Sequence, residues 1–155
     1  MGDTGVRAEL VGQFVGVDGT TGLFEHLIGL DRGEAVRRYR ASIACLDDRV
    51  FDLDDDQLDQ AWLPEAGVGR WPIRAVLGHL ADAEMMQSQR IRRAVAEPGS
   101  VTSAWDPDAW YDSGIYGSVG GPNGEAAVNG MPPPIGAFVA AIYTTRQWMG
   151  EWIGA

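Results

Sequence analysis

His79 is the residue of this chain whose type and surroundings best suit chemistry. It lies in the segment RWPIRAVLGHLADAE, on the border of the apolar face that Ile73, Leu77 and Leu80 would form on a helix. Asp82 follows about one turn later, close enough for a hydrogen bond to the imidazole. A histidine held by a carboxylate through one ring nitrogen can ligate a metal ion through the other. The alternative is a border histidine that hydrogen-bonds a neighbouring helix and binds no metal.

Few other residues could complete a metal site. A catalytic zinc site usually takes three protein ligands, and this chain contains two histidines and one cysteine. His26, in FEHLIGL, is interpreted as a surface or packing residue, and Cys45 as a buried, inert thiol. Asp82, Glu84 and Glu151 are the nearest candidate carboxylates. We therefore expect this chain to retain little zinc or nickel.

Composition excludes several classes of protein. A length of 155 residues suits one domain. Twelve basic against 22 acidic residues give a net charge of −10, which is unsuited to binding nucleic acid. No apolar run approaches the roughly 20 residues that span a bilayer, and the N-terminus lacks the pattern of a secretory signal. We expect a cytoplasmic protein with no membrane partner.

The pattern of apolar residues predicts three long helices and no strand. The first begins near Asp31, where D-R-G-E suggests a capping box with Glu34, and its apolar stripe is Val36, Tyr39, Ile43, Leu46 and Val50. A short turn capped by Asp54 should follow, through Leu58. Residues 1–30 are rich in glycine and are interpreted as a partly irregular extension, leaving 31–155 as the helical domain.

Prolines delimit the other two helices. Pro72 should occupy the first position of a helix that runs to about Glu97 and stops at Pro98-Gly99. From Trp105 to Pro134 the chain is rich in Gly, Pro and Asn, which indicates a long surface loop. The third helix should follow Pro132 to Pro134, with a stripe formed by Ile135, Phe138, Val139, Ile142, Met149, Trp152 and Ile153.

The order of three motifs resembles the DinB/YfiT-like superfamily of bacterial metalloenzymes. The motifs are W-x-I-x-x-x-x-x-H-L-A-D-A-E from Trp71, R-I-R-R from Arg90 and D-P-D-A-W from Asp106. The resemblance implies an up-down-down-up helical bundle, with a long link before the third helix. It also implies that His79 is the first of three histidine ligands to zinc or nickel. The other two form an H-x-x-x-H pair on a last helix, and this sequence stops before any such pair.

The resemblance gives other residues alternative roles. Arg90, Arg92 and Arg93 would bind an anionic substrate or a thiol cofactor, or else complement the dipole at the end of their helix. The loop from Trp105 to Tyr111 would cross the mouth of a pocket, or else form an Asp-Pro turn anchored by tryptophans. With the fourth helix missing, the bundle is truncated to three long helices. The uncovered face of the third helix then suggests a homodimer.

Two functions remain open at this point. The first is a DinB-like protein that resembles metal-dependent thiol transferases and hydrolases acting on small molecules, with an incomplete metal site. The second is a metal-free, inactive helical bundle that binds a small molecule or itself. The catalytic residues, the substrate and the thiol are not identified by the sequence.

Overall fold

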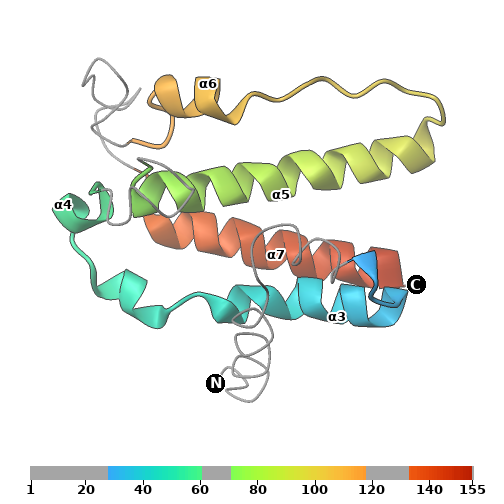
Figure 1. Cartoon of the computed structure of the whole chain (residues 1–155), viewed down its shortest axis with the longest axis horizontal. Helices are drawn as coiled ribbons and strands as arrows, with labels where there is room; N and C mark the ends of the chain where they lie inside the picture. The colour runs from blue at the N-terminus through green and yellow to red at the C-terminus, as the bar shows by residue number, and fades with distance from the viewer. Residues whose placement is uncertain (1–27, 61–70, 118–132, 155) are drawn as a thin grey trace. The chain divides into compact units, whose positions relative to one another are not determined.

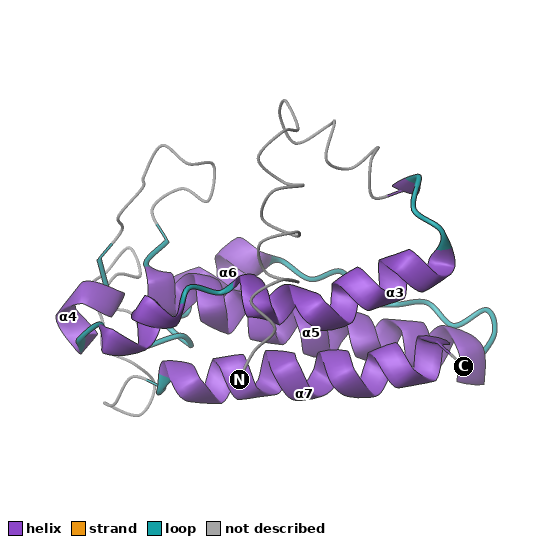
Figure 2. Cartoon of the chain, turned by 90° about the horizontal axis from the view of Figure 1, so that it is seen from below, coloured by secondary structure: helices purple, strands orange, loops and turns teal. Residues whose placement is uncertain are grey.

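Every regular element in the described part of the chain is helical. The computed structural model describes residues 28–60, 71–117 and 133–154, and no strand occurs among them (Figures 1 and 2). This confirms the all-α prediction. The elements are α3 (Arg32–Ala41), η1 (Ser42–Cys45), η2 (Asp48–Asp52), α4 (Asp55–Leu58), α5 (Ile73–Ala96), α6 (Pro107–Asp112) and α7 (Ile135–Gly154).

The chain divides into two compact units. One unit comprises Met1–Val50 and Tyr143–Ala155, and the other comprises Phe51–Ile142. In the first unit, α3 lies beside the C-terminal part of α7. Arg40 on α3 donates to Gln147, with Nη2 3.1 Å from Oε1, and Arg146 on α7 donates to the Ser42 hydroxyl at 2.6 Å. These polar contacts between side chains hold the two helices together.

The first helix is shorter than the sequence suggests. Asp31 caps it as expected, since its carboxylate accepts from the Glu34 amide at 3.0 Å. The Glu34 side chain does not reach back to the cap. It accepts instead from Arg37 and Arg38, and these hydrogen bonds lower the pKa of Glu34 to about 2. The prediction of a single α-helix that extends to Val50 is wrong.

The α-helical part of this segment ends at Ala41, and two 3₁₀ helices follow. Ser42 marks the change: its hydroxyl donates to the Tyr39 carbonyl at 2.8 Å. A serine side chain that binds the backbone competes with the regular pattern of helical hydrogen bonds. Residues 1–27, which include His26 and most of the expected extension, lie outside the described residues.

In the second unit, α4 has the cap that the sequence predicts. The Asp54 carboxylate accepts from the Gln57 amide at 2.8 Å, and the Gln57 side chain accepts from the Asp54 amide at 3.0 Å. This reciprocal pair satisfies two backbone donors that the first turn of a helix would otherwise leave unpaired. Leu58, at the end of α4, is buried.

A buried arginine joins three segments of the second unit. Arg74, in the first turn of α5, is 1% exposed. It donates to Asp59 at 2.7 Å, to Asp55 at 2.6 Å and to the Pro133 carbonyl at 3.0 Å. Burial opposes the charged form, but the hydrogen bonds to the two carboxylates outweigh it and the pKa of Arg74 is raised. Arg74 therefore connects α4, α5 and the segment before α7.

α5 agrees with its prediction to within one residue at each end. Pro72 is the N-cap rather than the first helical residue, and Glu97 is the C-cap. Gly99 then takes a positive φ of 87°, which reverses the chain beyond the helix. The segment after it runs back along α5 toward α6 (Figure 1), where the Ser103 carbonyl accepts from Arg90 at 2.8 Å.

The prediction of one long loop from Trp105 to Pro134 is wrong at its start, where α6 forms. Asp106 caps α6 by accepting from the amides of Asp108 and Ala109, both at 3.1 Å. Tyr116, only 2% exposed, belongs to the core. Aspartate before proline starts a helix well, and the burial of Tyr116 then fixes the end of this segment against the rest of the unit. Residues 118–132 lie outside the described part.

None of the helices described is both long enough and apolar enough to cross a membrane.

Candidate functional site

Five aromatic rings gather in the second unit, with the imidazole of His79 among them. The ring of His79 stacks on Trp105, with centroids 5.0 Å apart and planes at 15°, and meets the edge of Trp71, also at 5.0 Å. Trp71 in turn stacks on Tyr111 at 5.1 Å, and Trp105 meets Trp110 edge to face at 5.7 Å. We call Trp71, His79, Trp105, Trp110 and Tyr111 the aromatic cluster. None of its members is fully buried.

Three local features of the sequence build this cluster. Trp71 lies just before α5, Trp105 directly precedes the cap of α6, and Trp110 and Tyr111 are consecutive residues of α6. Because Gly99 reverses the chain, α6 comes to lie near the start of α5 (Figure 1). Offset-stacked and edge-to-face geometries are the ones that aromatic pairs prefer.

The imidazole of His79 has an unusual environment. Its Nδ1 atom is buried and has no hydrogen-bond partner, whereas Nε2 is not among the buried unpaired atoms. Burial lowers the pKa of His79 below its ordinary value of 6.5, and the nearby charges of Asp82 and Asp108 oppose this shift. Burial therefore favours the neutral form of the imidazole. A neutral imidazole can accept a proton, accept a hydrogen bond or ligate a metal.

Asp82 does not make the predicted hydrogen bond to the imidazole of His79. It influences the imidazole through its charge alone, and the expected hydrogen bond is absent from the described contacts. Burial raises the pKa of Asp82, and Tyr116 and His79 oppose that shift. Burial and the Asp82 carboxylate both raise the pKa of Tyr116, whose hydroxyl faces Asp82 without a hydrogen bond of ordinary geometry. His79, Asp82 and Tyr116 thus form a polar group beside the cluster.

The described donors do not fit a catalytic metal ion. Within residues 28–60, 71–117 and 133–154, no three or more His, Cys, Asp or Glu side chains are grouped so that they could hold one. A catalytic zinc site needs about three protein ligands. His79 offers one imidazole, and Glu151 lies 3.8 Å from Arg40 in an ion pair.

The arginines of α5 make structural contacts. Arg90 donates to the Ser103 carbonyl, and Arg93 donates to Glu97 at 2.8 Å in the last turn of the helix. Arg93 thus acts at the end of its helix, whereas Arg90 contacts a carbonyl beyond it, and the binding of an anion by the arginine cluster stays a prediction. The Nε atom of Arg90 is buried without a partner.

Two residues of the site were not singled out from the sequence. Trp71 served only as part of a motif, and Tyr116 was assigned to a surface loop. Gly78 is the residue from which the packing of a large side chain against α5 could have been predicted. A methyl group at Gly78 would overlap the Tyr116 ring, so only glycine lets the ring approach α5 so closely. A glycine in the middle of an otherwise strong helix often marks such an approach.

The low pKa of His79 predicts how stability depends on pH. A folded-state pKa below 6.5 means that His79 contributes stability above about pH 6.5, and that this contribution is lost as the pH falls toward the folded value. We expect His79→Phe, which keeps a ring in the stack, to reduce the fall in free energy of unfolding between pH 7 and pH 5. Urea unfolding at several pH values measures this. His26→Gln is the control, and equal slopes in wild type and His79→Phe would contradict the expectation.

Comparison with known proteins gives one informative similarity. No family model matches the chain, and no solved structure matches it. A protein of Oceanobacillus iheyensis, named a putative metal-dependent hydrolase, is 34% identical to this chain over 67 residues. The match covers 43% of this chain and 37% of that protein, so the chain spans little more than a third of its relative. The chain thus resembles, over part of its length, a protein named as metal-dependent.

Proposed function

We propose that this chain carries the small-molecule site of a DinB-like hydrolase or thiol transferase, built from the imidazole of His79 and the wall of the aromatic cluster. The observation that carries this proposal is the environment of His79. Its ring is stacked on Trp105 and meets the edge of Trp71, its Nδ1 is buried without a partner, and Trp105 Nε1 is likewise buried and unpaired. Because both atoms are buried, a ligand would have to insert between the rings to supply the hydrogen bonds that these atoms lack.

The partial similarity to a protein named as a metal-dependent hydrolase supports the reaction class. Thiol transfer, and zinc or nickel as the metal, come from the resemblance to DinB-like proteins. Among the described residues, His79 is the one candidate ligand that the motif assigns, and further ligands would have to come from elsewhere.

Binding can be tested through the tryptophan indoles, which serve as separate reporters in one spectrum. Phenyl acetate, a small aromatic ester, is the probe. We expect it to shift the indole N–H signals of Trp71, Trp105 and Trp110 and to leave those of Trp148 and Trp152 unchanged. His79→Ala should weaken these shifts. Shifts of all the indoles alike, or of none, would overturn the proposed site.

Metal content is tested on the same protein. We expect elemental analysis to find zinc and nickel well below one per chain, because the described donor set is incomplete. Stoichiometric metal in the wild type that is lost in His79→Ala would show that this chain completes its own metal site.

Self-association is a second candidate role. Tyr143, Trp148 and Trp152, on the C-terminal part of α7, are 53%, 48% and 39% exposed. Large exposed aromatic side chains often mark an interface. We expect light scattering after size-exclusion chromatography to give the mass of a dimer, and Trp148→Glu to shift it toward the monomer. A monomeric wild type at all concentrations would remove this role.

A further inference from the structure

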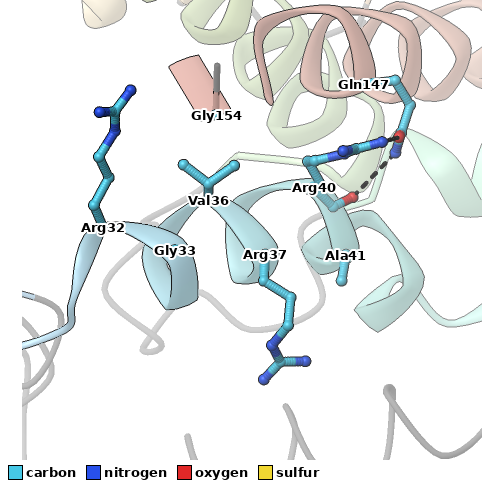
Figure 3. A pocket seen from close by; sticks show the side chains of 8 residues that line it. All are labelled: Arg32, Gly33, Val36, Arg37, Arg40, Ala41, Gln147 and Gly154. Atoms are coloured by element: carbon cyan, nitrogen blue, oxygen red, sulfur yellow. Dashed lines mark hydrogen bonds between the residues drawn. The ribbon is translucent and has the colours of Figure 1, made fainter. Parts of the chain in front are cut away.

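A basic groove lies in the first unit, and its lining shares no residue with the aromatic cluster. It has a volume of about 690 Å³ and is lined by Arg32, Gly33, Val36, Arg37, Arg40, Ala41, Gln147 and Gly154 (Figure 3). Three of the lining residues are arginines and none is acidic, in a chain whose net charge is −10. This local reversal of charge indicates a site for an anion.

Arg40 is held in place at one end of the groove. Its stem lies across Gly150, where a methyl group would overlap the arginine side chain. Gln147 Oε1 accepts from Arg40 Nε at 3.3 Å and from Nη2 at 3.1 Å (Figure 3). The exposed Glu151 carboxylate lies 3.8 Å from the guanidinium. Arg40 Nη1 has no partner among the described residues, so the guanidinium is positioned and still has donors to offer.

Arg32 lies at the other end of the groove. One of its guanidinium nitrogens donates to the Ile153 carbonyl, at the end of α7. No carboxylate of the described residues pairs with it, so its remaining donors face the groove or solvent. Arg37 differs from both, because it extends away from Gln147 and Gly154 (Figure 3) and pairs with Glu34. Arg32 and Arg40 are therefore the two cations available to a ligand.

The spacing of these residues defines the shape of the ligand. Arg32, Val36 and Arg40 follow one another at intervals of four residues, along one face of α3. At 1.5 Å of rise per residue, the two arginines are about 12 Å apart along the helix axis. The apolar side chain of Val36 lies between them (Figure 3). The groove thus presents a cation, an apolar surface and a second cation in line.

We propose that this groove binds an elongated dicarboxylate, with one carboxylate on Arg32, the other on Arg40, and an apolar spacer over Val36. The planar fork of a guanidinium matches a carboxylate through two parallel hydrogen bonds. The volume lies within the range of small-molecule sites. This inference goes beyond the function proposed above, since no residue of the aromatic cluster lines the groove.

The test compares three probes on the full chain by isothermal titration calorimetry. Octanedioate has two carboxylates on a long spacer, succinate has two on a short one, and octanoate has one on a long one. We expect octanedioate to bind about tenfold more tightly than either of the others, because only it can pair with both arginines. Arg32→Gln and Arg40→Gln should each reduce octanedioate to the level of octanoate.

Matched variants separate binding in the groove from binding to any exposed arginine. Arg49→Gln removes an exposed arginine that pairs with Asp47 outside the groove, and it should leave the affinity for octanedioate unchanged. His79→Ala should also leave it unchanged, so that failure of the proposed function and failure of this site can be told apart. If Arg40→Gln does not fold, Arg32→Gln decides the result. Equal affinities for the three probes, or equal losses in Arg49→Gln and Arg32→Gln, would overturn the proposal.

Discussion

Replacing Arg74 with methionine is expected to lower the free energy of unfolding by about 3–5 kcal/mol. The side chain of Arg74 is 1% exposed, and that of Asp59, its partner at 2.7 Å, is 16% exposed. Removing the guanidinium leaves the Asp59 carboxylate in a largely buried position without its counter-charge, and the Pro133 carbonyl without its donor. Asp55 contributes less to the loss, because it is 75% exposed and water can solvate it.

Urea unfolding followed by circular dichroism measures this loss. Arg49→Met is the matched control, because Arg49 pairs with Asp47 at 2.7 Å while 86% exposed, and we expect it to change the free energy of unfolding far less than Arg74→Met does. Adding Asp59→Asn to Arg74→Met should recover part of the loss, since it removes the uncompensated charge. Similar losses in the two arginine variants would show that Arg74 is not a structural centre of its unit.

Substituting Gly78 with alanine is expected to destabilise the protein by about 1–3 kcal/mol, although alanine is the better helix former. The reason is steric: the new methyl group would overlap the Tyr116 ring. Tyr116 is 2% exposed and has little room to move. We also expect the Trp105 indole signal to shift, because Tyr116 belongs to the segment that comes directly after the aromatic cluster.

Gly136→Ala is the control for this prediction. Gly136 also lies in a helix, but a methyl group there would meet no atom within 4 Å, so the change should stabilise the protein by about 0.5–1 kcal/mol. Tyr116→Leu should reduce the cost of Gly78→Ala in a double-mutant cycle, since a smaller side chain leaves more room. Equal effects of the two glycine substitutions would refute the close approach of Tyr116 to α5.

The aromatic cluster and the basic groove offer different chemistry. The cluster holds the imidazole of His79 among aromatic rings, with His79 Nδ1 and Trp105 Nε1 buried and unpaired, and we propose that it takes an uncharged organic molecule. The groove presents two arginines on either side of a valine, which suits an elongated anion. The two sites draw on separate residues, so each can be removed by substitution without altering the side chains of the other.

Local signals in the sequence were enough to locate most helix ends. Asp54 capped α4, Pro98-Gly99 ended α5 and the proline run preceded α7, because capping and the restrictions imposed by proline depend only on neighbouring residues. The same local reasoning failed at Ala41 and at α6. In the first case a side chain competed for a backbone carbonyl. In the second, a composition typical of loops concealed a capped helix and a buried tyrosine.

The partners of the key side chains could not be read from the sequence, because they come from distant residues. Arg74 reads as an ordinary exposed arginine in a first turn, yet carboxylates 15 and 19 residues before it and a carbonyl 59 residues after it enclose its charge. His79 is half-buried, but Leu80, which the pattern placed on the packed face beside it, is 40% exposed, and the predicted partner, Asp82, makes no hydrogen bond to the imidazole. The actual neighbours of His79 are the rings of Trp71, just before α5, and of Trp105, which the reversal of the chain after α5 brings to the imidazole.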